Sequence, residues 1–141
     1  MNPEESAEQT NIIHPPRPLA KKYFEPILYL ADRMAAADGE VVPKENRIID
    51  LLAKAGNMEK FRTSKGYRDL SQNKACELLD IEAAKRGALV ILALVLKSDL
   101  RRSDSEQEYF HRIRTLLNTD AVTVPVELET HKNLALEYIT Q

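Results

Sequence analysis

The sequence predicts an all-α protein, a bundle of about six or seven helices, and three observations support this class. Apolar residues recur at spacings of three and four positions along most of the chain, which is the period of an amphipathic helix. Residue types that favour helix ends, mainly Ser, Pro, Gly and Asn, lie between these segments. No clear segment alternates apolar and polar residues between hairpin turns. Only residues 121–126 approach that pattern, and Pro125 interrupts them.

Residues 1–18 have no apolar periodicity and end in a segment with three prolines, which stop a helix. We expect a flexible tail there and a single helical domain over residues 19–141. The first helix is predicted from Leu19 to an Asp-Gly pair at Asp38, because glycine commonly follows a helix end. Pro26 is an alternative first turn for this helix.

Pro43 is predicted to open the second helix, because proline is favoured at the first helical position. This helix should end near the Gly-Asn pair at 56–57, and the helical signal is weak over residues 58–70. Ser71 is expected to cap the next helix, over residues 72–79. The face of the second helix comprises Ile48, Ile49, Leu52 and Ala55.

A long helix is predicted over about residues 81–98. Ser103 and Glu106 have the spacing of a capping box that opens the following helix, for which Asn118 is the expected stop. A last helix should follow Pro125. The predicted apolar positions of these last two helices are Tyr109, Phe110, Ile113, Leu116 and Leu117, then Leu128, Leu134, Leu136 and Ile139.

Composition and charge exclude several classes. The 141 residues include 20 Lys plus Arg and 22 Asp plus Glu, a net charge of −2, which does not suit a protein that neutralises nucleic-acid phosphates. The longest apolar run, residues 88–96, is shorter than the ~20 residues that span a bilayer. A single cysteine fits a reducing compartment. We therefore expect a cytoplasmic protein with no direct membrane insertion and no nucleic-acid partner.

The chain aligns with itself at an offset of 61 positions, which divides it into two pseudo-repeats at about 24–57 and 81–118. Six apolar pairs match at this offset, but any two amphipathic helices share a period, so these matches carry little weight. The pairs are Leu30 and Ile91, Ala31 and Leu92, Met34 and Val95, Ala35 and Leu96, Ile49 and Phe110, and Leu52 and Ile113.

Acidic residues match at the same offset: Asp38 with Asp99, and Glu45 with Glu106. Each half places an Asp after its long helix and a Glu in the first turn of the next. If the halves pack about a pseudo-twofold axis, up to four carboxylates come together, and such a cluster requires a cation or a proton. Oxygen ligands favour Mg²⁺ or Ca²⁺ over Zn²⁺.

Each acid also has a purely structural explanation. A first-turn carboxylate such as Glu45 or Glu106 is stabilised by the helix dipole. Asp38 begins a common Asp-Gly turn, and Asp99 is followed by two arginines that offer it a partner. The sequence alone leaves metal binding and helix capping open.

Residues 35–45, Ala-Ala-Ala-Asp-Gly-Glu-Val-Val-Pro-Lys-Glu, resemble the A-x-A-D-G-x-[IV]-x-x-x-E stretch of the TerB-like tellurite-resistance family. Residues 97–117 are similar to the second copy of that stretch. The resemblance implies an internally duplicated helical domain whose repeated acids hold a divalent metal. By position, Asp38 and Glu45 match the first copy, and Asp99 and Glu106 match the second.

The second copy departs from the family pattern at Leu100, which replaces the glycine, and at Arg101 and Arg102, where neutral or acidic residues are usual. The resemblance implies a role in resistance to tellurium oxyanions and other stresses, often beside a membrane-protein partner. We therefore expect a non-enzymatic TerB-like protein that binds a divalent cation. The alternative is a metal-free helical interaction module in a stress-response or membrane-associated complex.

Other chemical motifs are weaker. Glu108 and His111 form half of a di-iron pattern, but the position equivalent to His111 is Asp50, so His111 is expected to be a surface or packing residue rather than part of a metal-dependent enzyme. Cys76 has no histidine placed near it and is expected to be buried and inert. The basic segment 60–68 is expected to be a solvated connector, with contact to an anionic partner as the alternative.

Overall fold

The computed structural model describes residues 19–37, 43–97, 104–119 and 128–139, so the predicted N-terminal tail and residues 121–126 lie outside the described residues. The described residues form helices and no strand, which confirms the all-α class. The seven α-helices and two 3-10 turns in this part of the chain are η1 (Lys21–Tyr23), α2 (Phe24–Ala35), α3 (Pro43–Ala55), η2 (Phe61–Thr63), α4 (Lys65–Arg68), α5 (Gln72–Leu78), α6 (Glu82–Lys97), α7 (Asp104–Leu116) and α8 (Leu128–Ile139).

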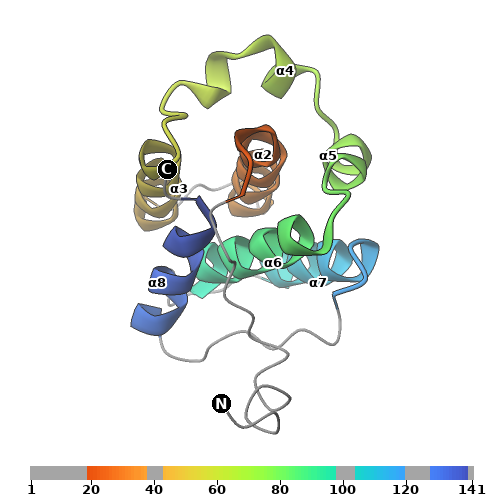
Figure 1. The fold of residues 1–141 in the computed structure, drawn as a ribbon. Helices are drawn as coiled ribbons and strands as arrows, with labels where there is room; N and C mark the ends of the chain where they lie inside the picture. The colour runs from red at the N-terminus through yellow and green to blue at the C-terminus, as the bar shows by residue number, and fades with distance from the viewer. Residues whose placement is uncertain (1–18, 38–42, 98–103, 120–127, 140–141) are drawn as a thin grey trace, which may run out of the picture.

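The helices form two layers (Figure 1). One layer contains α3, α2 and α5, and the other contains α8, α6 and α7, with α2 packed on α6 at the centre. The connector between α3 and α5, which carries η2 and α4, passes over α2 on the side away from α6. Helix α2 therefore lies between α3, α5, α6 and this connector.

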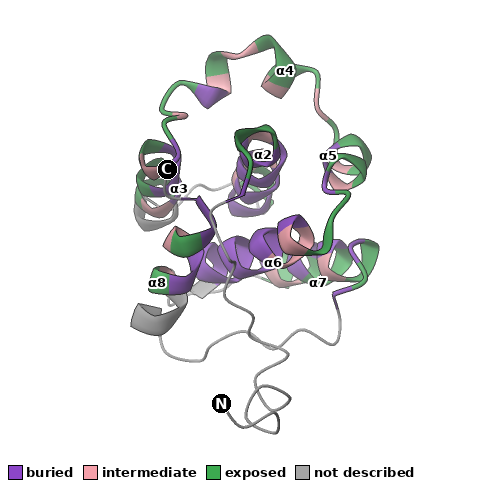
Figure 2. Cartoon of the chain, viewed as in Figure 1, coloured by how far each residue is buried: buried purple, intermediate pink, exposed green. Residues whose placement is uncertain are grey.

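The two central helices bury the most apolar surface (Figure 2). All residues from Ala88 to Leu96 are buried, as expected for the central helix of the bundle. Helix α8 approaches α6 closely at Gly87, where a Cβ atom would lie 2.9 Å from the Tyr138 ring. A glycine in mid-helix lowers helix propensity, and here it permits this close packing.

Several helix ends lie where the sequence predicts them. Pro43 is the first residue of α3, and Ser71 caps α5, its Oγ accepting a hydrogen bond of 3.2 Å from the Lys74 amide. Asn57 and Asn118, the predicted stops of α3 and α7, have positive φ angles of 57° and 56°. Asparagine tolerates this left-handed conformation. The conformation ends a helix, because backbone amides beyond the helix end then donate hydrogen bonds to its last carbonyl groups.

Residues 58–70, where the helical signal is weak, contain two short helices, η2 and α4. Two details of the prediction are wrong. The α-helical part of the first helix begins at Phe24, after a 3-10 turn, rather than at Leu19, and Pro26 lies in its first turn, as the alternative predicts. Leu116 is 49% exposed, because α7 turns the face carrying Ile113 and Leu117 toward the core instead.

Helices α3 and α7 are in register at the offset of 61 positions: both their first and last residues are related by it. The left-handed asparagines and the closing hydrogen bonds, from Met58 to Ala53 and from Thr119 to Arg114, are related in the same way. Helix α2 contacts α3, α6 and α7, while α6 contacts α7, α2 and α3. Any two amphipathic helices of equal length with similar ends also give this pattern, so the internal duplication stays a prediction.

Candidate functional site

The four predicted metal ligands are described to different extents. Asp38 and Asp99 lie outside the described residues, and Glu45 lies in the first turn of α3 with its side chain outside them. Glu106, in the first turn of α7, is only 1% exposed. The first turn of α7 thus places a carboxylate inside the protein, at the position that the sequence repeat singles out. Its distance from the other three carboxylates is not defined by the described residues.

No group of three or more His, Cys, Asp or Glu side chains able to hold a metal occurs among the side chains that the structure describes. Only Glu106 of the four predicted ligands belongs to that set. The proposed partner of Glu106 in a capping box, Ser103, and the arginines Arg101 and Arg102 also lie outside the described residues. The prediction of a cation site is therefore untested.

A hydrogen-bonded charged group, which we call the Arg62 cluster, is formed by Asp32, Asp50, Arg62 and Tyr67. The Arg62 guanidinium donates from Nε and Nη2 to the two carboxylate oxygens of Asp32, both at 2.8 Å, and from Nη1 to Asp50 at 2.9 Å. The Tyr67 hydroxyl donates to Asp32 at 2.7 Å. This cluster ties the connector that follows α3 to the polar side of α2.

Burial differs between the two acids of the Arg62 cluster. The side chain of Asp32 is 14% exposed and that of Asp50 is 61% exposed. The hydrogen bond to Asp32 raises the pKa of Arg62 above its usual value. The pKa of Tyr67 is also raised, mainly by burial and also by its hydrogen bond to the Asp32 carboxylate. Arg62 therefore stays charged and Tyr67 stays a hydrogen-bond donor at neutral pH. Because it is bidentate and more buried, the ion pair of Arg62 with Asp32 is stronger than its ion pair with Asp50.

Aromatic contacts complete the Arg62 cluster. The Arg62 guanidinium carbon lies 4.5 Å from the centre of the Phe61 ring, and Tyr67 packs edge-on against both Phe61 and Tyr29. Of the predicted basic connector, Arg62 is thus engaged within the protein, whereas Lys60 and Lys65 are exposed. Sequence reasoning missed Asp32 because its partner lies 30 positions away and no local pattern joins them.

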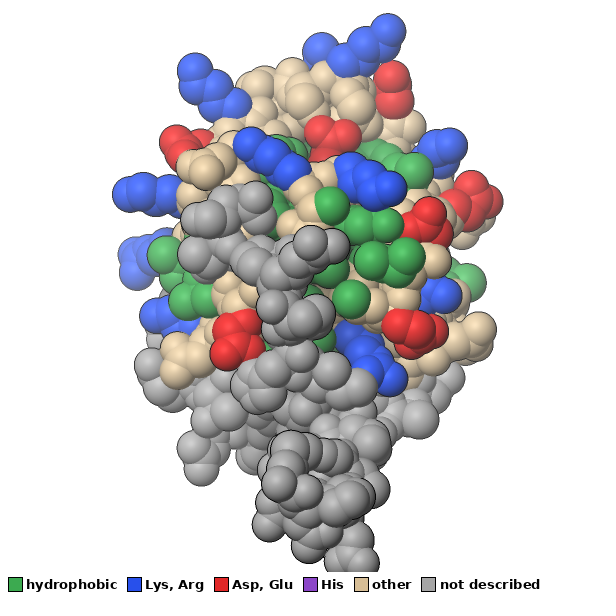
Figure 3. Space-filling view, viewed as in Figure 1, with side chains coloured by type: hydrophobic (Ala, Val, Ile, Leu, Met, Phe, Trp, Pro, Cys, Tyr) green, Lys and Arg blue, Asp and Glu red, His purple; other side chains and the backbone are tan. Residues whose placement is uncertain are grey.

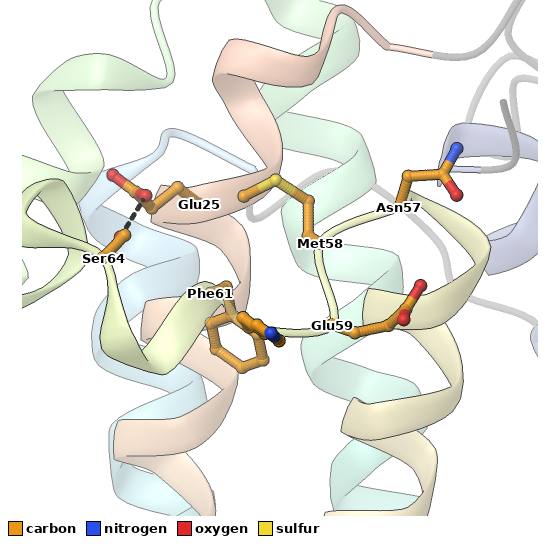
Figure 4. Close-up of a pocket in the computed structure, with 7 residues that line it drawn as sticks. Glu25, Asn57, Met58, Glu59, Phe61 and Ser64 are labelled. Atoms are coloured by element: carbon orange, nitrogen blue, oxygen red, sulfur yellow. Dashed lines mark hydrogen bonds between the residues drawn. The ribbon is translucent and has the colours of Figure 1, made fainter.

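A cavity of about 470 Å³ lies between the start of α2 and the connector (Figure 4). Met58 and Phe61 provide its apolar lining, and Glu25 faces it from α2. The Glu25 carboxylate accepts a hydrogen bond of 2.7 Å from Ser64, and a Cβ atom on Gly66 would collide with this carboxylate. The glycine therefore allows the connector to approach α2, and the carboxylate serves mainly to hold it there.

A second cavity, of about 370 Å³, lies between α2 and α7. Arg33 lines it from α2, while Glu108, Tyr109 and Arg112 line it from α7. The Tyr109 hydroxyl oxygen is buried and has no hydrogen-bond partner among the described residues. Burial raises the pKa of Tyr109, while the charges of Arg33 and Arg112 act in the opposite direction. This cavity combines positive charge with an unused hydrogen-bond donor.

The remaining candidates have less support. His111 is exposed and packs edge-on against Phe110, in agreement with a surface or packing role. Cys76 is half-buried rather than fully buried, and burial raises the pKa of its thiol, which makes it a poor nucleophile at neutral pH. On the face shown in Figure 3, basic and acidic side chains are intermixed.

None of the described helices combines the length and apolar character required to cross a bilayer. Comparison of the chain with protein-family models, with curated proteins and with solved structures gives no match. The resemblance to the TerB-like family therefore remains a prediction that rests on the repeated acidic motif.

Proposed function

We propose that the protein is a TerB-like stress-resistance protein that binds a divalent cation and is not an enzyme. Asp38, Glu45, Asp99 and Glu106 are the proposed ligands, with Mg²⁺ or Ca²⁺ favoured over Zn²⁺ because all four donors are carboxylates. A cytoplasmic location, a role against tellurium oxyanions and a membrane-protein partner belong to the same proposal. They rest on the motif at residues 35–45 and its second copy.

The observation that carries this proposal is the burial of Glu106, which is 1% exposed. Charged residues are seldom buried to this depth unless hydrogen bonds or an opposite charge compensate the loss of water. The first turn of α7 favours a carboxylate through its free amides and its dipole. A cation held by Glu106 together with Asp99, seven positions earlier, would place an opposite charge beside this buried carboxylate.

A thermal melt of the full chain in chelator, and then with Mg²⁺, Ca²⁺ or Zn²⁺, tests cation binding. At 100 times its Kd, a ligand that binds only the folded state adds about 2.7 kcal/mol, or about 5 to 11 °C for a domain of this size. We expect Glu106→Gln to abolish most of this shift. Glu77→Gln, which removes an exposed carboxylate on α5, should leave it unchanged.

The second candidate function is the metal-free interaction module, and exposed apolar side chains favour it. Leu78 and Ile81, at the junction of α5 and α6, are 41% and 44% exposed. Exposed apolar residues that cluster in a surface are typical of protein contacts. This function predicts equal melting temperatures in chelator and in every metal. It also predicts that Asp38→Asn and Asp99→Asn have small effects that do not depend on metal. A metal-dependent melt would exclude it.

A further inference from the structure

The cavity between α2 and α7 is lined by one face of α7 and by the C-terminal end of α2. Ser105, Glu108, Tyr109 and Arg112 follow the i, i+3, i+4, i+7 spacing, so they share one face of α7. Arg33 lines the cavity from the last turn of α2, and two alanines at 36 and 37 line it from the turn that follows this helix. Helices normally bury apolar residues along such a contact. Here the short alanines leave space and the α7 face is mainly polar.

The positive charges of this cavity are not neutralised within the described part of the protein. Arg33 and Arg112 are exposed, and neither forms an ion pair there, whereas Arg62 is paired with two carboxylates. Glu108 is the only acid among the described lining residues. The two guanidiniums belong to different helices and both act on the same tyrosine hydroxyl. The cavity lining thus contains two positively charged side chains and one negatively charged side chain.

Tyr109 adds a donor that the fold itself does not use. Its side chain is 9% exposed and its hydroxyl oxygen is buried without a hydrogen-bond partner among the described residues. A buried tyrosine hydroxyl usually finds a partner, because burial removes the hydrogen bonds that it would make with water. Burial keeps the hydroxyl protonated at neutral pH, so it needs an acceptor. An acceptor beside two guanidiniums is most stable when it is negatively charged.

We propose that this cavity binds the oxyanion group of a small molecule, either a phosphate or a carboxylate. Arg33 supplies the charge from α2 and Arg112 from α7, and Tyr109, whose buried hydroxyl has no partner among the described residues, offers a hydrogen bond. The volume of about 370 Å³ lies at the lower end of the ~300 to 1,000 Å³ range of small-molecule sites. Glu108 disfavours a second negative group and favours a ligand with a hydroxyl or amino group near its oxyanion.

Ala37 and Ser105 of this lining directly adjoin Asp38 and Glu106 of the proposed cation site, so the test is done in chelator, where anion binding cannot depend on a bound metal. The full chain is titrated by calorimetry with inorganic phosphate and, in parallel, with acetate, at low ionic strength. We expect saturable binding of at least one of them. Tighter binding of phosphate assigns a phosphate group, and tighter binding of acetate assigns a carboxylate. The absence of saturable binding by either anion up to about 10 mM, ten times a Kd of about 1 mM, would overturn the proposal.

Variants show whether binding occurs at this cavity. Arg33→Gln and Arg112→Gln should each weaken the anion about tenfold, equivalent to about 1.4 kcal/mol, which is near the value of one charge-assisted hydrogen bond. Tyr109→Phe should also weaken it about tenfold, because its hydroxyl donates to a charged acceptor. Arg68→Gln removes the same charge from an exposed position on α4 and should have no effect.

The result that contradicts a defined site is equal weakening by Arg68→Gln and by Arg33→Gln, because that indicates non-specific attraction to net charge. Arg33 and Arg112 are exposed, so their variants are expected to fold, and their melting temperatures without anion verify this. Arg112→Lys offers a further check. It keeps the charge but loses the planar fork of donors, so it should bind with intermediate affinity.

Discussion

The Arg62 cluster and the cavity between α2 and α7 use similar residues in opposite ways. Each contains arginine, a partly or fully buried tyrosine and an acid, and each draws on one of two neighbouring residues of α2, Asp32 or Arg33. In the Arg62 cluster the guanidinium and the tyrosine hydroxyl both meet carboxylate oxygens at 2.7 to 2.9 Å. In the cavity the two guanidiniums form no ion pair within the described part of the chain.

This difference indicates different roles. The connector between α3 and α5 is largely exposed and contributes a single buried large side chain, Phe61, so paired charges hold it on α2 in place of an apolar core. The cavity lies between two helices that are already fixed by their buried residues. Its charges have no ion-pair partner among the described residues, which is consistent with the proposed anionic ligand.

The largest effect should follow from removal of the acid at the centre of the Arg62 cluster. Asp32→Ala leaves Arg62 and Tyr67 without their main acceptor, and we expect a loss of about 2 kcal/mol in the free energy of unfolding. Asp50 is 61% exposed, so Asp50→Ala should cost less than about 1 kcal/mol. Urea unfolding of the two variants measures both values. Equal costs would mean that the bidentate pair adds nothing beyond a surface ion pair.

The same chemical change at the two tyrosines should have unequal effects. Tyr67→Phe removes a hydrogen bond to a charged acceptor and should cost about 1 to 2 kcal/mol. Tyr109→Phe removes a buried hydroxyl without a described partner and should change stability by less than about 0.5 kcal/mol or increase it. Chemical unfolding without added anion compares them. A loss at Tyr109 as large as that at Tyr67 would show that its hydroxyl is already satisfied in the folded protein.

The last prediction concerns alkaline pH. The pKa values of Tyr67 and Tyr109 are raised in the folded protein above the ordinary value of about 10 that applies to the unfolded chain. Their contribution to stability is therefore fully present below pH ~10 and is lost as pH rises above it, by at most about 1.4 kcal/mol per pH unit for each group. Unfolding free energies at pH 8 and at higher pH measure this loss. Each Tyr→Phe variant should reduce it.

Local sequence signals predict much of this fold, because the period of a helix and the chemistry of its ends depend on neighbouring residues. The apolar run of α6, the cap at Ser71 and the left-handed stops at Asn57 and Asn118 are all confirmed. Leu116 shows where such reasoning fails. It fits the apolar period of α7, but the side on which α7 meets the core leaves it 49% exposed.

The candidate sites were less predictable. The repeat marks Glu106, which the structure buries, but a one-dimensional offset does not establish whether four carboxylates meet. The ion pair between Arg62 and Asp32 joins residues 30 positions apart. It forms because the connector between α3 and α5 passes over α2. No local pattern indicated that Arg33 would face Tyr109 and Arg112, because that depends on which sides of α2 and α7 come together.

The sequence by itself determined that this protein is helical, where most of its helices end, and which acids recur at a fixed offset. Those properties follow from the helical period, from capping and from residue type, which act over a few positions. Only the tertiary structure decided which charges are paired and which face a cavity. An ion pair or a binding site depends on how the faces of distant helices meet, and packing of the whole chain sets that geometry.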